Sequence, residues 1–442
     1  MGGRLAQFAK GWESLTSSAW HLRVVKEGLT LPFHSCPPLT LVPKPIKLPN
    51  HPDKRRVLLE EVDSLLLKEA LELAPQDPGF FSHLFTVPKA TGGFRPVIDL
   101  KGLNRCISCP HFHMETDAII RSQLQVGEWT TSIDLKDAYL HIPVHPGFRK
   151  YLRFHIQGVS YQFRAMCFGL NIAPRIFTKL LTPAVMALRR DGVKVHRYLD
   201  DWLIRGGSLV EVRNSTARVL SQLQSLGFIV NNEKSDLVPK RRFVFLGMDI
   251  DLSSGLVRPS PQNLEKVHSM VSLFLSAESV SVRQFLSLLG LLNYVSQFSP
   301  LARLRLRPLQ FYLKTKVPDL RDALQAALLL DALCKEALQW WSVPAHLGGG
   351  VPLHPPEPEL TLATDASLFG WSGVLEGRSI AGRWSADERG LHISALELRA
   401  VYLAVSQLAP HLQGKVICLL ADNVAAVDER IRFPCFRRPG RF

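Results

Sequence analysis

The sequence predicts an α+β fold divided into several domains, and three observations carry that prediction. The chain has 442 residues, a length that suggests about three domains. Strand-like runs alternate with helical patterns up to about residue 250, as is typical of α+β proteins. From Pro261 onward apolar residues recur mostly at helical spacing, so the next region is expected to be largely helical.

Proline and glycine mark the expected domain boundaries. The stretch from Cys36 to Pro49 is proline-rich and is expected to be an extended linker, and residues from Leu347 to Pro358 mark a second linker. Between them, apolar residues at three-to-four spacing predict an amphipathic helix from Val57 to Leu73 that Pro75 and Pro78 end. The expected segments are residues 1–50, 51–255, 256–345, 346–358 and 359–442.

Composition and charge indicate what kind of partner the protein binds and in which cell compartment it is found. The formal net charge of +14 and a pI of about 9.6 fit a polyanionic partner, because neutralising phosphates supplies most sequence-independent affinity for nucleic acid. No apolar run reaches the roughly 18 residues that a membrane-spanning helix needs, and no secretory signal pattern is present. Seven scattered cysteines, an odd number, indicate reduced thiols. We therefore expect a soluble, intracellular protein of the cytoplasm or nucleus that is not secreted.

Three acidic residues form the most informative pattern. Asp200 and Asp201 follow Tyr198-Leu199 between β-favouring residues, which predicts a hairpin with both acids at its turn. Asp134 ends another strand-like run and could lie beside them. Carboxylates that converge in this way suit Mg²⁺, which prefers oxygen ligands. For an isolated Asp-Asp pair a solvated turn is the ordinary interpretation, so the surrounding motifs decide.

Those motifs occur in a fixed order along the chain. They are Ser132–Tyr139, Phe168–Pro174, Tyr198–Asp201, Leu226–Phe228 with Lys234, and Phe245–Gly247, preceded by Val87–Lys89 and Phe94–Leu100. In order and spacing they resemble the palm motifs of reverse transcriptases, with the first two resembling the fingers motifs. The resemblance implies a right-hand polymerase of fingers, palm and helical thumb, with residues 51–255 as fingers and palm and 256–345 as thumb and connection.

The beginning of the chain resembles a narrower group. Gly2 to Trp12, with Trp20, Gly28 and Phe33, is similar to the leader before the polymerase in DIRS-type, tyrosine-recombinase retrotransposons. This favours that branch over gypsy-class elements, to which it is related.

The resemblance assigns expected roles to individual residues. Asp134, Asp200 and Asp201 would bind two Mg²⁺ ions, or Mn²⁺, about 3.5–4 Å apart, which activate the primer hydroxyl and stabilise the leaving pyrophosphate. Lys234 would protonate that pyrophosphate. Tyr139 would exclude a ribose hydroxyl, Phe168 and Gly169 would shape the floor of the nucleotide site, and Lys89 and Arg95 would clamp the triphosphate. Asp99 and Asp137 are assigned to structural hydrogen bonding.

A second set of acids follows the second linker. Asp365 ends a strand-like run, Glu397 lies in an expected helix, and Asp422 follows another strand-like run. These resemble the first three metal-binding acids of ribonuclease H, and a fourth is not found before the chain stops. The expectation is a ribonuclease H-like α/β domain, truncated at its C-terminus, with weak or no nuclease activity.

Three functions remain open from the sequence. The first is an RNA-directed DNA polymerase of a retrotransposon, which would bind an RNA template, a DNA primer, an RNA/DNA hybrid and deoxynucleoside triphosphates. The second is a catalytically decayed or host-adopted nucleic-acid-binding relic of the same fold. The third is another two-metal polymerase, such as an RNA-dependent RNA polymerase, against which Tyr139 and the nuclease-like segment argue. The acids Asp134, Asp200 and Asp201 favour the first function over the second, because in a protein that only binds nucleic acid their negative charges would repel the ligand.

Overall fold

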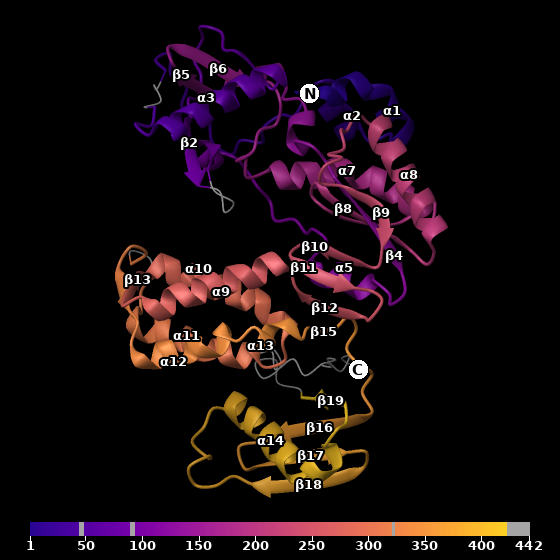
Figure 1. The fold of residues 1–442 in the computed structure, drawn as a ribbon, viewed down its shortest axis with the longest axis vertical. Coiled ribbons are helices and arrows are strands. Elements are labelled where there is room, and N and C mark those ends of the chain that lie inside the picture. Colours follow the sequence, from indigo (N-terminus) through magenta and orange to yellow (C-terminus); the bar gives the residue numbers. More distant parts are fainter. Residues whose placement is uncertain (44–47, 89–92, 321–322, 422–442) are drawn as a thin grey trace.

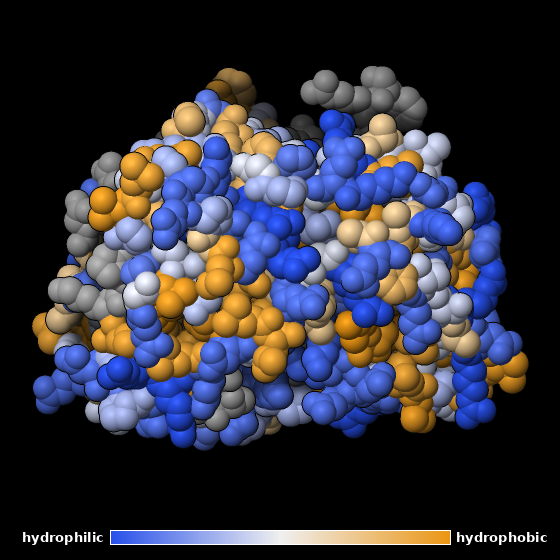
Figure 2. Space-filling view, turned by 90° about the horizontal axis from the view of Figure 1, so that it is seen from above, coloured by the Kyte–Doolittle hydropathy of each residue, from blue (hydrophilic) through white to orange (hydrophobic). Residues whose placement is uncertain are grey.

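The computed structural model describes residues 1–43, 48–88, 93–320 and 323–421. Figure 1 shows three tiers along the long axis, with the N-terminal half at the top, a sheet and a helical group in the middle, and a smaller sheet with one long helix at the bottom. Seen from above, hydrophilic residues cover most of the top tier, with hydrophobic residues gathered in smaller patches between them (Figure 2). Within the described residues, no helix combines the length and the apolar character needed to cross a bilayer.

The N-terminal segment is helical and packs on the top tier. It contains η1 (Arg4–Phe8), α1 (Ala9–Leu15) and α2 (Ala19–Lys26). Trp12 is fully buried, and its indole Nε1 donates a hydrogen bond to the carbonyl of Leu226, 3.1 Å away. Burying the large indole with its polar atom paired avoids a desolvation cost, so this segment belongs to the main core.

The region after the first linker differs from the expected helix. α3 runs over Pro52–Leu67, and Leu71–Leu73 is a strand, β1, that pairs with Phe163–Tyr161. The prediction of one helix from Val57 to Leu73 was therefore wrong at both ends. Pro52 begins the helix, and Glu69, with a φ of 55°, turns the chain before the prolines are reached. Pairing with a strand that lies far along the sequence overrides the local helical spacing.

Two small sheets surround α3. β1 joins β6 (Val159–Phe163) and β5 (Arg153–Ile156), and β2 (His83–Pro88) pairs with β3 (Phe94–Asp99) in a hairpin. The short helices α4 (Lys101–Asn104), α6 (Pro146–Arg149) and the 3-10 turn η2 (Ala138–His141) connect these strands to the rest.

The central sheet has the order β7-β8-β4-β9. Its strands are β4 (Trp129–Asp134), β7 (Lys194–Tyr198), β8 (Asp201–Gly206) and β9 (Asp236–Lys240). α7 (Ala173–Arg190) and α8 (Leu209–Ser225) pack on this sheet in the largest hydrophobic core, which contains Trp202 and Ile204. Leu203, between them on β8, belongs to a different core with Ile120 of α5 (Asp117–Gln123). The sheet is therefore covered on both faces, and this fixes the side to which each β8 residue points.

A second four-stranded sheet follows. Its order is β10-β11-β12-β15, formed by β10 (Arg242–Phe245), β11 (Met248–Asp251), β12 (Leu256–Pro259) and β15 (Val351–Pro352). β15 lies inside the segment expected to be a linker, and the boundary expected at residue 255 falls inside this sheet. The proline and glycine signals could not indicate that Val351 pairs with Val257 across a sequence separation of almost one hundred residues.

The helical region after this sheet is close to the expectation. It contains α9 (Pro261–Ser276), α10 (Val282–Val295), α11 (Ala302–Lys316) and α12 (Ala332–Gln339), which share one hydrophobic core. Short elements complete it: β13 (Ser279–Ser281) paired with β14 (Ala327–Leu329), η3 (Ser296–Phe298), η4 (Trp340–Ser342) and α13 (Ala345–Gly348). The Tyr294 hydroxyl of α10 donates to the carbonyl of Leu246 at 2.7 Å, which ties the helices to the β10–β11 turn.

The last described segment is a sheet of order β18-β17-β16-β19. It consists of β16 (Leu360–Ala366), β17 (Gly370–Leu375), β18 (Arg378–Arg383) and β19 (Ile417–Leu420), with α14 (Ile393–Gln407) and the short α15 (Ala409–Leu412). β16 and β19 are parallel, whereas the other pairs are antiparallel. α14 packs on β16 and β17 around a separate core that includes Leu362 and Leu396.

Candidate active site

Strand pairing brings two of the three expected acids together. β4 and β8 are antiparallel, and their register makes Asp134 and Asp201 Cα partners. Directly opposed residues share one face of a sheet. Three positions before Asp134, and so on the other face, the hydroxyl of Thr131 lies 2.6 Å from that of Thr216 in α8, so that face meets α8. By the alternation of side chains, Asp134 and Asp201 occupy the face opposite α8.

The turn between β7 and β8 adds the third acid. Tyr198 pairs with Asp201, which leaves Leu199 and Asp200 as a two-residue loop. Leu199 has a φ of 54°, a left-handed conformation that costs a branched residue about 1–2 kcal/mol. The carbonyl of Asp200 accepts a hydrogen bond from the Leu135 amide at 3.1 Å. The expected hairpin with both acids at its turn is confirmed, and the chain beyond Asp134 holds it in place.

A third segment fixes the backbone of Asp134 from the other side. The Asp134 amide donates to the Ser235 hydroxyl at 3.0 Å, and the Asn231 amide donates to the Asp134 carbonyl at 2.8 Å. Lys234, within this loop, is exposed, and its charge acts on both Asp200 and Asp201. The loop therefore places Lys234, as the sequence predicted, close enough to the acids for its charge to act on them.

The electrostatics of the acids show that they are crowded. Burial raises the pKa of Asp201 to about 6, with further contributions from the charges of Asp200 and Asp134 and a smaller opposing one from Lys234. Burial, together with Asp134, also raises the pKa of Asp200. A cation would offset the repulsion that Asp200 and Asp201 experience from their acidic neighbours, and carboxylate oxygens suit Mg²⁺.

The side chains are not already arranged as a closed ligand set. Within the described ranges, no three His, Cys, Asp or Glu side chains surround a common cation position. A Mg²⁺ site that uses few protein carboxylates and completes its shell with substrate phosphates and water does not need such a set. The residues present therefore fit the metal by chemistry and by backbone placement.

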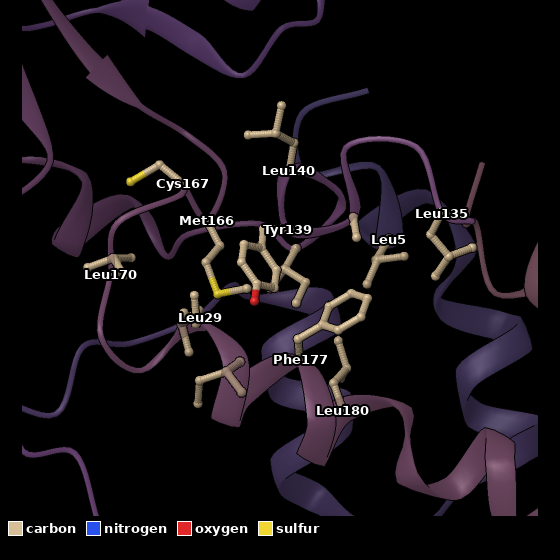
Figure 3. Packing of buried hydrophobic residues seen from close by; sticks show 14 of the residues in the cluster. Leu5, Leu29, Leu135, Tyr139, Leu140, Met166, Cys167, Leu170, Phe177 and Leu180 are labelled. Carbon is tan, nitrogen blue, oxygen red and sulfur yellow. The ribbon is translucent and has the colours of Figure 1, made fainter. Parts of the chain in front are cut away.

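Tyr139 lies beside these acids in a hydrophobic cluster. Figure 3 shows its ring near Met166 and Phe177, and the ring centroids of Tyr139 and Phe177 are 5.4 Å apart. Burial raises the pKa of Tyr139 to about 12, with Asp200 and Tyr198 contributing. The phenol therefore stays protonated, and it is within electrostatic reach of Asp200.

The expected floor residues contact Tyr139. The ring of Phe168 is half-exposed and its centroid lies 4.9 Å from that of Tyr139. Gly169 has a φ of 100°, and an added Cβ would lie 3.2 Å from the Ile98 carbonyl of β3, so glycine is needed there. Sequence reasoning missed Asn104, whose side-chain amide donates to the Gly169 carbonyl at 2.8 Å and whose Oδ1 accepts from the Asn171 amide. No local pattern around Asn104 signals this contact.

The two residues expected to clamp a triphosphate cannot be placed in the same detail. Lys89 lies outside the described residues. Arg95 lies in β3 as the partner of Val87, and only its backbone is described. The two acids that were expected to have structural roles do make such contacts. Asp99 accepts a hydrogen bond from the Lys101 amide at 3.0 Å, and Asp137 forms an ion pair with Lys68 at 2.9 Å.

A chain of charged groups supports the β7–β8 hairpin and was not expected. Glu128 accepts two hydrogen bonds from Arg205, at 2.7 and 3.0 Å, and Arg205 also donates to Nε2 of His196 at 3.1 Å. Nδ1 of His196 lies 3.4 Å from Glu115, which also binds Arg189. Glu128 and His196 are buried, so their polar atoms would carry a desolvation cost without these contacts.

The nuclease-like acids have different environments. Asp365 is exposed near the end of β16, whereas Glu397 is only 3% exposed on the side of α14 that packs on the sheet. Asp422 lies outside the described residues. A recess of about 210 Å³ adjoins Asp365 and is lined with Ser367, Ser372 and Trp371.

Comparison with solved structures assigns the class of fold. The chain is similar to the foamy viral protease–reverse transcriptase dRH in complex with double-stranded DNA, with a TM-score of 0.61, 16% identity, and coverage of 97% of this chain and 77% of that one. It is similar, with a TM-score of 0.60 and 16% identity, to the foamy viral enzyme in complex with an RNA/DNA hybrid, over 96% of this chain and 58% of that one. The chain has a polymerase fold, which confirms the expected class.

Comparison with families gives the particular kind of domain. Residues 87–250 match the family described as reverse transcriptase (RNA-dependent DNA polymerase), so the chain contains a reverse transcriptase domain. It is 26% identical over 387 residues to the enzymatic polyprotein of Cauliflower mosaic virus (strain CM-1841), covering 82% of this chain and 54% of that protein. It is also 26% identical over 367 residues to the genome polyprotein of Petunia vein clearing virus (isolate Hohn), covering 79% of this chain and 16% of that protein. The chain thus spans about half the length of the first relative and less of the second.

Glu115 allows a test of the support behind the hairpin. Burial would raise its pKa, but His196 and Arg189 outweigh burial and hold the pKa of Glu115 at about 2, below the ordinary 4.5. A depressed carboxyl pKa stabilises the fold above the unfolded value, and this contribution is lost as the pH falls from 4.5 towards 2. Relative to Glu115→Gln, wild type is expected to have the higher free energy of unfolding at neutral pH, and the difference should shrink below pH 4.5. Urea unfolding at a series of pH values measures it, and a pH-independent difference would contradict this assignment.

Proposed function

We propose that this chain is an RNA-directed DNA polymerase, the reverse transcriptase of a retroelement. The observation that carries the proposal is the pairing of Asp134 with Asp201, next to Asp200 and Lys234, within a reverse transcriptase domain. A purely nucleic-acid-binding protein would gain nothing from three acids crowded together, because they repel phosphates. An enzymatic function therefore explains why the acids are grouped despite their repulsion, whereas a role in binding alone does not.

Asp134, Asp200 and Asp201 would hold two Mg²⁺ ions, or Mn²⁺ in their place. When bound, such ions supply activation of the attacking hydroxyl and neutralisation of charge on the transferred phosphoryl group. The protein's own contribution is to hold Asp134 and Asp201 on one face of the sheet through the β4–β8 register, with Asp200 in the adjoining turn after Leu199. Lys234 has the charge and the location to donate a proton to the leaving pyrophosphate.

The nucleotide would bind between the acids and the Tyr139–Phe168 pair. The Tyr139 ring is fixed by Phe168 and Phe177, so it would meet a ribose 2′-hydroxyl as a rigid obstacle. Phe168 and Gly169 would form the floor against the base pair. Lys89, and Arg95 of β3, would bind the triphosphate.

The partners follow from this reaction. They are an RNA template, a DNA primer, the RNA/DNA hybrid that forms and deoxynucleoside triphosphates. The net charge of +14 supports binding to the phosphate backbone. The foamy viral relatives were solved with double-stranded DNA and with an RNA/DNA hybrid, which supports the same classes of ligand for this chain.

The proposal also includes the type of retroelement and the cell compartment. The motif from Gly2 to Trp12 supports a DIRS-type, tyrosine-recombinase retrotransposon. All six cysteines in the described part of the chain are free thiols, which supports a reducing, intracellular location such as the cytoplasm or nucleus.

Residues 359–442 would belong to a ribonuclease H-like domain. Its support is the strand, helix and parallel strand that carry or precede Asp365, Glu397 and Asp422. Because Asp365 is exposed and Glu397 buried, the described carboxylates offer a weak site for a cation.

The polymerase assignment is tested at Asp200. We expect Asp200→Asn to lower primer extension on homopolymeric RNA, with Mg²⁺ or Mn²⁺, by at least about a thousandfold, while template–primer binding is retained. Asp191→Asn is the matched control, because Asp191 is an exposed acid of the same domain that pairs with Arg218. Normal extension by Asp200→Asn would show that the catalytic assignment is wrong.

The role of Tyr139 is tested by sugar discrimination. We expect Tyr139→Ala to lower the preference for deoxynucleotides over ribonucleotides by about tenfold or more, because the obstacle to the 2′-hydroxyl is removed. Tyr139→Phe keeps the ring and should keep the preference. The measurement is the ratio of kcat/KM for the two nucleotides, and an unchanged ratio in Tyr139→Ala would remove the gate role.

The nuclease-like segment is tested with a labelled RNA in an RNA/DNA hybrid. We expect weak or no cleavage by this chain, and no further change in Asp365→Asn. Robust cleavage that Asp365→Asn abolishes would instead show that these acids form a working site.

A further inference from the structure

The N-terminal leader, defined here as residues 2–29, contacts the segment that carries Tyr139. We name residues 137–145 the gate segment. The leader bonds to the gate segment in two places and also lines the hydrophobic cluster around Tyr139. The roles proposed above do not involve the leader. It is nevertheless well packed, against segments that are distant from it in sequence.

The first contact lies directly after Tyr139 in the gate segment. The Gly3 amide donates to the Leu140 carbonyl at 2.9 Å, and the Gly2 amide donates to the Lys68 carbonyl at 2.6 Å. Lys68 in turn forms the ion pair with Asp137, whose φ of 48° starts the turn towards Tyr139. The leader therefore joins the end of α3 to the turn on which Tyr139 lies.

Space at this contact is limited. A Cβ on Gly2 would lie 2.1 Å from the Glu69 carbonyl oxygen, and a Cβ on Gly3, whose φ is 70°, would lie 3.3 Å from the Cβ of Pro143. A side chain on Gly2 must move the backbone that follows α3, and one on Gly3 would strain its left-handed backbone and press on Pro143.

The second contact lies at the far end of the gate segment. The Leu29 amide donates to the Pro143 carbonyl at 2.7 Å, and the His145 amide donates to the Leu29 carbonyl at 3.1 Å. Gly28 has a φ of 102°, and a Cβ there would lie 2.4 Å from the His145 amide nitrogen. The chain thus pairs with the gate segment as a short parallel bridge between Leu29 and Val144.

Between the two ends, leader side chains fill the cluster around Tyr139. Leu5 and Leu29 belong to this cluster and lie on either side of Tyr139 and Phe177 in Figure 3. The leader is itself anchored in the central domain, because Arg4 donates to the Gly227 carbonyl at 3.0 Å and Trp12 to that of Leu226. A displaced leader would leave the gate segment without support on this side.

We propose that the N-terminal leader is a positioning element that sets the depth of the Tyr139 ring and so determines sugar discrimination, with Gly3 of the leader and Lys68, the residue after α3 to which the leader bonds, as positioning residues. This rests on the proposed polymerase function and on the gate role of Tyr139. The leader acts through Tyr139 and does not itself meet the nucleotide. Loosening it therefore changes the choice between nucleotides more than the rate with deoxynucleotides.

Two variants with matched controls test the proposal. Lys68→Met removes the ion pair with Asp137, and its control, Lys26→Met, removes the pair between Lys26 and Glu13 that lies 2.5 Å apart within the leader. Gly3→Ala strains a left-handed residue that touches Pro143, and its control, Gly158→Ala, strains a residue with a φ of 79° and no atom within 4 Å of the added Cβ. Each full-length variant is assayed for kcat and KM with deoxy- and ribonucleotides, beside wild type and Tyr139→Ala, after its thermal unfolding is recorded.

We expect discrimination to fall about twofold to fivefold in Lys68→Met and further in Gly3→Ala, with little change in kcat for deoxynucleotides. Lys26→Met and Gly158→Ala should discriminate as wild type does. If Tyr139→Ala lost discrimination while Lys68→Met and Gly3→Ala kept it, the leader proposal would be overturned and the polymerase would stand. Equal losses in the controls would also overturn it, because they would report general destabilisation. A wild-type chain that extends no primer would instead refute the proposed function itself.

Discussion

The antiparallel register of β4 and β8 is the constraint on which the site depends. A slip by one residue would turn every side chain of β8 to the opposite face and separate Asp201 from Asp134. The register is fixed because both faces are buried in different cores: Trp202 and Ile204 pack towards α7 and α8, and Leu203 packs towards α5 and the second sheet. Hydrophobic packing on both faces thus decides where the polar ends of the strands meet.

Grouping the acids is unfavourable for the folded chain by itself. Burial and mutual repulsion raise the pKa of Asp201 to about 6, and Leu199 adopts a left-handed conformation at the turn. These costs are tolerated because the surroundings are held rigidly. The Glu128–Arg205–His196–Glu115 chain supports the hairpin, and the loop from Asn231 to Ser235 clamps Asp134. Functional sites commonly combine local strain with such a fixed frame.

Other turns of the polymerase domain are also held by hydrogen bonds from residues distant in sequence. Asn104, the last residue of α4, holds the Gly169 turn, and Tyr294 of α10 holds the Leu246 turn. The leader holds the gate segment from the N-terminal side. These three segments are each held by a hydrogen bond from a distant part of the chain.

The sequence by itself determined the parts that local pattern encodes. The β-favouring residues around Asp200 and Asp201 predicted the hairpin, the texture after Pro261 predicted the helices, and the order of motifs predicted a polymerase fold. Local pattern could not predict contacts between distant segments. The strand Leu71–Leu73, the pairing of Val351 with Val257, the hydrogen bond from Asn104 and the packing of the leader against Tyr139 each depend on residues far apart in sequence. Only the tertiary structure decides these, because the free energy that favours them comes from burial and pairing across the fold and not from the propensities of neighbouring residues.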